Sequence, residues 1–209
     1  MPRIHNKNTR EPRQKRSIEM KQRIMEAARL LFSEKGLHGT SSNEIVEKAG
    51  VSIGSFYSYF PDKRTLYLEV LESFINTVSA HILSDAIEFR YTGEEHDIKE
   101  TLYQYLKNVF RSFDIDLRFH AQTIALRFTD ADIAKIYDAA EKRELQYIKN
   151  ILIQFRKSRP LGIEDIDMAA KIIHGSIAYL VHSIKFFNYR SDEDRLINEL
   201  AQSIFKYIA

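Results

Sequence analysis

Apolar residues recur at helical spacing along nearly the whole of this chain, separated by short polar segments. Between Ser17 and Lys35, Ile24, Ala27 and Leu31 fall three or four positions apart, which places them on one face of a helix. No run of residues alternates as a strand would. The pattern predicts an all-α fold, with helices over residues 17–35, 41–50, 52–59, 62–89, 98–113, 115–128, 130–156, 163–187 and 192–208.

The breaks between these helices coincide with residues that do not continue a helix. Only 7 Gly and 4 Pro occur in 209 residues, and Pro160 and Gly162 punctuate the chain before the last two helices. Gly93 lies in the polar segment from Tyr91 to Asp97, which we expect to end the long fourth helix. Ser17 is the expected cap of the first helix.

The second and third helices carry strong local signals. Ser41 and Glu44 form a capping box, in which each residue bonds to the backbone of the other. Gly50 supplies the positive φ that a sharp turn after this helix requires, and Ser52 caps the next one. We expect Ile45, Val46 and Ala49 to face inward.

The third helix is short, because Pro61 cannot lie inside a helix, and Asp62 caps the helix that follows. Two short helices joined by a turn with glycine are typical of a helix-turn-helix, whose second helix enters the major groove of DNA. Small residues keep one side of this helix slim while aromatic residues anchor the other: Gly54, Ser55 and Ser58 against Phe56 and Phe60.

At this point the chain resembles the tetracycline-repressor-like (TetR) family of regulators. The residues that match the family signature are Gly36, Thr40, Ser41, Ile45, Ala49, Gly50, Val51, Ser52, Gly54, Tyr57, Tyr59, Phe60, Lys63 and Leu66. Val46 departs from the usual Ala, and Ser42 stands where an apolar residue is frequent. The resemblance covers about the first third of the chain and implies the nine-helix fold, a DNA-binding head and a larger effector-binding body.

Candidate DNA contacts follow from the resemblance and from the chemistry of the residues. Helix N-termini bind phosphate, which favours backbone contacts from Ser41, Ser42 and Asn43, and Asn43 is long enough to reach a base. The positions expected to face bases are Ile53, Gly54, Ser55, Ser58 and Tyr59, and the expected phosphate clamps are Tyr57 and Lys63. The alternatives are a plain cap for Ser41, a core ring for Tyr57 and a solvated charge for Lys63.

The charge is uneven along the chain. Residues 1–70 hold 13 Lys and Arg against 8 Asp and Glu, a balance of +5, so that the remaining residues carry −3 of the total of +2. Six of the basic residues lie in the first sixteen, opposite one Glu, in a segment with two Pro that we expect to be disordered. This arm either follows the DNA backbone or minor groove or is a solvated tail.

These observations predict three parts: a basic arm over residues 1–16, a helix-turn-helix domain over 17–61 and a helical effector-binding and dimerisation domain over 62–209. There is no cysteine, no apolar run long enough to span a bilayer and no signal peptide, so we expect a soluble cytoplasmic protein without a membrane partner. No phosphate-binding glycine loop, HExxH motif or metal-ligand spacing occurs, which argues against an enzyme, a cofactor or a metal site.

The larger domain is rich in aromatic residues. Such residues at helical spacing usually form a core, but the resemblance also implies a cavity for a small apolar or aromatic effector. The candidate ligand-binding residues are Phe89, Tyr103, Phe110, His120, Thr123, Arg127, Tyr137, His174 and Tyr179. A histidine on an apolar face is more often a satisfied core residue than a ligand contact.

The sequence therefore predicts a transcriptional regulator, a repressor released from a palindromic double-stranded operator by a small effector. We expect a homodimer through the last two helices, by way of Ala169, Ile172, Ile173, Ser176, Leu180, Ile184, Phe187, Ile197, Leu200, Ile204 and Phe205. The alternative is a DNA-binding adaptor or architectural protein controlled by a protein partner, with no small-molecule ligand. A collapsed body would favour the adaptor, and a cavity lined by aromatic residues would favour the sensor.

Overall fold

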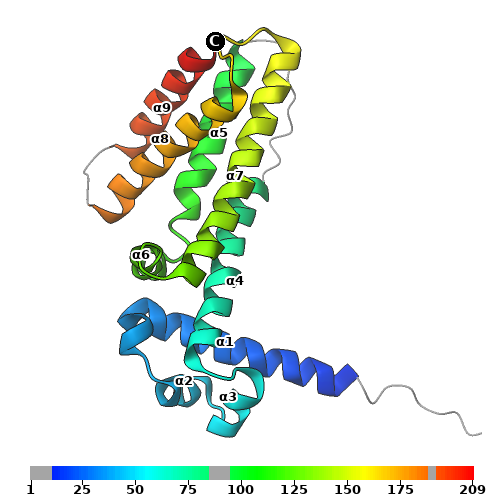
Figure 1. Cartoon of the computed structure of the whole chain (residues 1–209), viewed down its shortest axis with the longest axis vertical. Coiled ribbons are helices and arrows are strands. Elements are labelled where there is room, and N and C mark those ends of the chain that lie inside the picture. The colour runs from blue at the N-terminus through cyan, green and yellow to red at the C-terminus, as the bar shows by residue number, and fades with distance from the viewer. Residues whose placement is uncertain (1–10, 85–94, 188–191) are drawn as a thin grey trace, which may run out of the picture. The chain divides into compact units, whose positions relative to one another are not determined.

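The structure, a computed structural model, describes residues 11–84, 95–187 and 192–209. Over these ranges the chain forms helices and no strand, which confirms the predicted all-α fold (Figure 1). The helices are α1 (Glu11–Gly39), α2 (Ser42–Ala49), α3 (Ile53–Tyr59), α4 (Lys63–Ser84), α5 (Glu95–Ser112), α6 (Leu117–Leu126), α7 (Ala131–Ser158), α8 (Ile166–Phe186) and α9 (Glu193–Ile208).

The chain divides into two compact units, residues 1–72 and residues 73–209. The division lies inside α4, beyond the boundary at 61/62 that the sequence suggested. The reason is that the first turns of α4 belong to the core of the first unit. Tyr67 is 1% exposed and packs edge to face on Phe32 of α1, with ring centroids 4.9 Å apart.

The first unit contains α1, α2, α3 and the start of α4 around a single core. The predicted inward face of α1 is buried, as are Ile45, Val46 and Ala49 of α2. Phe56 and Phe60 are fully buried and anchor α3 from one side, as the sequence predicted. Burying one face of so short a helix on this core holds it in place, because an isolated helix of this length is not stable.

The start of α1 differs from the prediction. Residues 11–16, which we assigned to a disordered arm, are helical, and Ser17 lies inside α1 instead of capping it. The first ten residues of the predicted arm lie outside the described residues. At its other end the regular helix breaks at Gly36, whose φ of 70° lies in the region that favours glycine.

The predicted caps around the turn are confirmed. Ser41 and Glu44 form the reciprocal capping box, and Gly50 ends α2 with φ 63°. Ser52 accepts from the amide of Ser55 at 3.1 Å and so caps α3. Bonds from Lys35 and Ser41 hold the pKa of the Glu44 carboxyl at about 2, well below its ordinary value.

The second unit is a helical bundle in which α5 packs against α9 and α7 against α8 (Figure 1). The observed bounds of these helices lie within a few residues of the predicted ones, and Asp116, Asp130, Asp165 and Asp192 cap α6 to α9. Glu95 begins α5, a little before the predicted start at Ile98. The predicted end of the fourth helix at Phe89 lies outside the described residues.

The predicted dimer face of α9 is used inside the unit. Ile197, Leu200, Ile204 and Phe205 are all at most 7% exposed. Helix α9 packs against α5 within the unit, so little of this apolar face is exposed, and a dimer through the last two helices stays a prediction. Among the described helices, none is long and apolar enough to cross a membrane.

Candidate nucleic-acid interface and internal cavity

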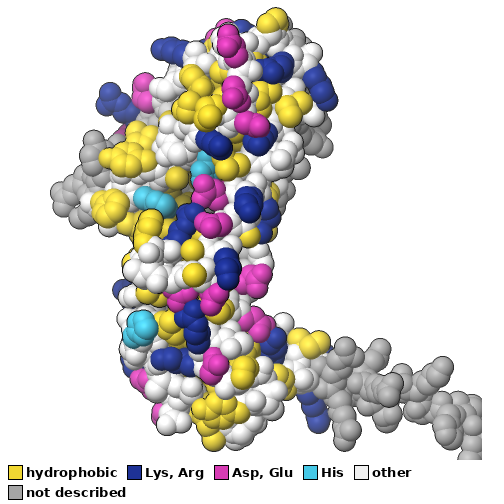
Figure 2. Space-filling model, in the orientation of Figure 1, with side chains coloured by type: hydrophobic (Ala, Val, Ile, Leu, Met, Phe, Trp, Pro, Cys, Tyr) yellow, Lys and Arg dark blue, Asp and Glu magenta, His cyan; other side chains and the backbone are white. Residues whose placement is uncertain are grey.

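The outer face of α3 is exposed and carries two large side chains. Ile53 is 41% exposed and Tyr57 is 55% exposed, and they lie one helical turn apart with Gly54 and Ser58 beside them. Figure 2 shows hydrophobic side chains on the surface over α3, at the lower end of the view. A β carbon at Gly54 would meet only Ser52 Oγ, at 3.9 Å, so packing within the chain does not require glycine here.

The N-terminus of α2, the second group of predicted DNA contacts, precedes α3 in the chain. Ser41 and Asn43 are exposed and Ser42 is half-buried. The hydroxyl of Ser41 bonds to the side chain and the backbone amide of Glu44, so Ser41 acts as the cap of α2. A cap whose side chain is exposed can still approach phosphate.

The third helix also makes internal bonds that limit its free groups. Ser55 Oγ pairs with Ser52 Oγ at 2.8 Å, and Ser58 Oγ donates to the carbonyl of Ser55 at 2.7 Å. The Tyr59 ring is half-buried and its hydroxyl lies 3.1 Å from Ser17 Oγ on α1. Tyr59 therefore ties α3 to α1 and lies on a different side of the helix from Ile53 and Tyr57.

Two cations hold the backbone around the turn. The guanidinium of Arg23 donates to the carbonyls of Ala49, at 2.6 Å, and Gly50. Lys63, the predicted phosphate clamp, is half-buried, and its ammonium group donates to the carbonyls of Leu37, at 2.7 Å, and Thr40. Two of its three N–H donors are thus used to close the segment between α1 and α2, a role that the sequence did not indicate.

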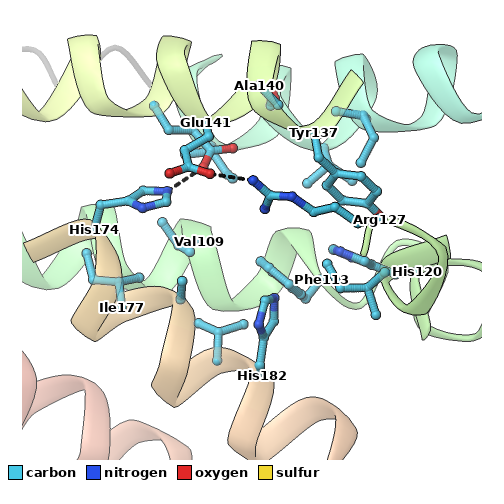
Figure 3. A pocket seen from close by; sticks show the side chains of 18 of the residues that line it. Val109, Phe113, His120, Arg127, Tyr137, Ala140, Glu141, His174, Ile177 and His182 are labelled. Atoms are coloured by element: carbon cyan, nitrogen blue, oxygen red, sulfur yellow. Dashed lines mark hydrogen bonds and ion pairs between the residues drawn. The ribbon is translucent and has the colours of Figure 1, made fainter. Parts of the chain in front are cut away.

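The second unit contains a cavity of about 100 Å³ between five helices (Figure 3). Its walls are mostly apolar, with Tyr105, Phe113 and Tyr137 among them. The polar groups in the walls are Ser79 from α4, His120 and Arg127 from α6 and its end, Glu141 and Glu144 from α7, and His174 and His182 from α8. Burial raises the pKa of Tyr137 to about 12 and also raises that of Tyr105.

The charged groups in the wall are paired with each other. Arg127 donates to Asp138 at 2.9 Å and to Glu141 at 2.6 Å. His174 Nε2 lies 3.0 Å from a carboxylate oxygen of Glu144. Figure 3 shows Arg127 and His174 each directed at a glutamate of α7.

Histidines 120 and 182 lie in a more apolar part of the wall. His120 stacks on Phe113, with ring centroids 4.7 Å apart, and is 4% exposed. Burial, with a smaller effect from His182, lowers the pKa of His120 to about 4, and burial also lowers that of His182. Both rings are therefore neutral at pH 7.

The structure brings four of the predicted ligand-binding residues to this cavity: His120, Arg127, Tyr137 and His174. Thr123 lies behind the wall, where its hydroxyl is 2.6 Å from that of Tyr137.

The other predicted residues do not line the cavity. Phe110 is fully buried in the core, and Tyr179 is 71% exposed because it lies on the opposite side of α8 from Ile177 and Val181. Tyr103 lines a shallow surface depression between α5 and α9 instead, and Phe89 lies outside the described residues.

Sequence reasoning missed Ser79, Glu141, Glu144 and His182. Each faces the same side of its helix as buried apolar residues, a signal that the helical spacing contains. That signal alone does not separate them from polar residues at the edge of a core.

A helix-turn-helix unit followed, in the same chain, by a helical bundle with a cavity is the arrangement of helix-turn-helix regulators. The sequence pattern described as "Bacterial regulatory proteins, tetR family" matches residues 24–70. The match covers the helix-turn-helix unit, so the chain is similar to this family over that unit.

Curated relatives and a solved structure agree. The chain is 29% identical over 101 residues to the uncharacterized HTH-type transcriptional regulator YdgC of Bacillus subtilis (strain 168), covering 48% of this chain and 51% of YdgC. It is 26% identical over 154 residues to the biofilm operon icaADBC HTH-type negative transcriptional regulator IcaR of Staphylococcus aureus (strain Newman), covering 66% of this chain and 81% of IcaR.

The fold is that of a TetR-family transcriptional regulator from Mesorhizobium loti MAFF303099, with a TM-score of 0.74 at 23% identity, over 93% of this chain and 98% of that one. The chain spans about half the length of YdgC, the first of its curated relatives. Both curated relatives are named as transcriptional regulators.

Proposed function

We propose that the chain is a DNA-binding transcriptional repressor that reads its operator with the outer face of α3 and leaves it when a small molecule enters the cavity of the second unit. The observation that carries the first step is the exposed face formed by Ile53, Gly54, Tyr57 and Ser58. An exposed isoleucine and tyrosine with a glycine between them suit close approach to a major groove.

Each residue of this face has a role that its chemistry supports. Ile53 suits the methyl group of thymine, and Gly54 lets the backbone approach. The hydroxyl of Tyr57 reaches a phosphate, and Asn43 at the start of α2 reaches a phosphate or a base edge. Tyr59 and Ser55 are better assigned to holding α3 in place, because their hydroxyls already bond within the unit.

The proposed repressor works as a homodimer whose interface is the outward face of α8. This face carries Met168, Ile172, Tyr179 and Phe187, which are between 50% and 78% exposed. Figure 2 shows hydrophobic side chains gathered on the surface over this part of the second unit. At Gly175, near the middle of the face, an added β carbon would meet nothing within 4 Å, so a second helix can approach closely. A two-fold dimer would present two α3 helices to half-sites about 34–36 Å apart.

The cavity supports the sensor over the partner-controlled adaptor. A cavity lined by Tyr105, Phe113 and Tyr137 offers apolar burial with a few polar groups, as small-molecule sites do. Because α4 contributes to the core of the first unit and, through Ile75 to Ile82, to the cavity wall, one helix can transmit a change at the ligand to the DNA-binding unit. The relative IcaR is a negative transcriptional regulator, which supports a repressing sign.

The DNA step is tested by selecting sequences from a random duplex library and measuring their affinity by fluorescence anisotropy at several salt concentrations. Tyr57→Phe should weaken binding to all selected sequences alike and leave the salt slope unchanged, because the lost hydroxyl is neutral, whereas Ile53→Ala should change the preference among them. Tyr207→Phe removes the hydroxyl of another exposed tyrosine and serves as the matched control. Wild-type affinity in both α3 variants would exclude this face as the reader.

The dimer is tested by sedimentation of the wild type and of Tyr179→Glu. We expect a wild-type dimer at micromolar concentration and a monomer for the variant, because a buried carboxylate without a partner opposes association. Tyr207→Glu, on the outer side of α9, is the control and should leave the dimer intact. A wild-type monomer contradicts the proposal.

A further inference from the structure

Two side chains in the cavity wall hold a buried polar atom that lacks a hydrogen-bond partner within the described part of the chain. They are Ser79 Oγ on α4 and His120 Nδ1 on α6, and both residues are 4% exposed. A serine inside a helix often bonds to the carbonyl four residues back, but Ser79 does not. Since buried polar groups are nearly always paired, two such atoms in residues lining the same cavity point to a partner that enters it.

The charged groups in the wall are, by contrast, already matched. Arg127 has two carboxylate partners, and Glu144 has His174. A carboxylate ligand would have to displace Asp138 or Glu141 from Arg127 and would be repelled by the glutamates. A cation would have to compete with Arg127 or His174 for the same glutamates.

We propose that the cavity binds a small, uncharged and mostly apolar molecule that carries a hydroxyl group, for which Ser79 and His120 are the polar anchors. A hydroxyl group both donates and accepts, so it can pair with the serine hydroxyl and with either tautomer of the histidine. The aromatic walls bury the rest of the molecule. This inference rests on the proposed function, because it names the chemical class of the effector.

The state of His120 and the size of the cavity agree with this class. Burial keeps the His120 ring neutral, so it offers a hydrogen bond without a charge that would attract an anion. The volume of about 100 Å³ is below the roughly 150 Å³ of an apolar cavity that holds benzene, so a ligand with one ring requires a modest opening of the walls.

The test compares four probes that share one ring and differ in one group: benzyl alcohol, toluene, benzoate and benzylammonium. Their affinity for the full chain is measured by calorimetry at pH 7.5, where His120 is neutral. We expect benzyl alcohol to bind about tenfold more tightly than the other three, as one or two hydrogen bonds to buried unpaired groups imply. A preference for benzoate or benzylammonium, or no binding of benzyl alcohol, overturns the inference.

Two variants assign the preference to the two anchors. Ser79→Ala and His120→Phe should each reduce the affinity for benzyl alcohol toward that for toluene, and leave the affinity for toluene within about twofold, because only the hydroxyl loses a partner. Ser203→Ala removes an exposed serine hydroxyl from α9, away from the cavity, and is the control. An unchanged preference in both variants contradicts the assignment. If the larger ring of His120→Phe prevents folding, Ser79→Ala decides the matter, since it only removes an atom.

The result of the ligand-binding test can be separated from the effect of the ligand on DNA binding. Binding with the expected preference, but without any change in DNA affinity, would refute the effector step of the proposed function and leave the ligand class standing. Release from DNA by benzoate or benzylammonium with no response to benzyl alcohol would support the proposed function and refute the ligand class.

Discussion

Replacement of Lys63 by alanine should destabilise the first unit, whatever its effect on DNA. The ammonium group of Lys63 donates to the carbonyls of Leu37 and Thr40, in the segment that links α1 to α2. Thr40 itself is 2% exposed and its hydroxyl donates to the carbonyl of Gly36 at 2.9 Å. Removing Lys63 therefore leaves two carbonyls unpaired beside a buried residue.

The magnitude follows from these two bonds. A hydrogen bond to a charged group contributes about 1.5–3 kcal/mol, but water can replace part of it here because Lys63 is only half-buried. We expect the free energy of unfolding of the first unit to fall by about 2 kcal/mol, which is roughly a 30-fold change in an equilibrium constant.

Amide hydrogen exchange of the full chain measures this locally, as a loss of about 30-fold in protection for the core amides of α1 to α3. Lys48→Ala is the matched control, because it removes one positive charge from the exposed last turn of α2, where the helix dipole contributes only about 0.3–1 kcal/mol. Equal protection in Lys63→Ala and Lys48→Ala would refute the structural role. A salt slope for DNA binding that falls by about one unit in Lys63→Ala, and not in Lys48→Ala, would show that its third N–H also contacts phosphate.

Three further predictions concern the turn, the cavity and the arm. Gly50→Ala should lower the free energy of unfolding by about 1–2 kcal/mol in urea denaturation, because φ is 63° and the new β carbon would lie 3.0 Å from the Arg23 side chain; no loss would mean that the turn relaxes without strain. Stability should decrease by roughly 3 kcal/mol as the pH falls from about 6.5 to about 4, because unfolded His120 then binds a proton that the folded form excludes. His120→Phe should lose less stability over that interval, and identical pH profiles of the two proteins would remove His120 as the cause. Deletion of residues 1–10, which hold three Lys and Arg, should reduce the salt slope of DNA binding by up to about three units if the arm follows the backbone, and leave it unchanged if the arm is a solvated tail.

The elements of the DNA-binding unit could be predicted closely because their signals are local. The box of Ser41 and Glu44, the positive φ of Gly50 and the cap of Ser52 act over three or four residues, and the chain places those residues together in any fold that contains the helix. Helical spacing likewise identified the buried side of α1, although it did not locate the start of the helix before Ser17.

Only the tertiary structure decided between contact partners that the sequence pattern does not distinguish. The bonds of Lys63 to carbonyls more than 20 residues away, and of Tyr59 to Ser17, give two predicted DNA contacts a role inside the first unit that the sequence did not indicate. Tyr137 and Tyr179 follow the same helical pattern, yet one lines the cavity and the other faces solvent, because only the packing of five helices defines where the void is. The apolar face of α9 could serve a second copy of the chain or a helix of its own chain. Its burial in its own unit leaves the outward face of α8 as the candidate interface, since an apolar surface covered within one chain has no further apolar area to remove from water.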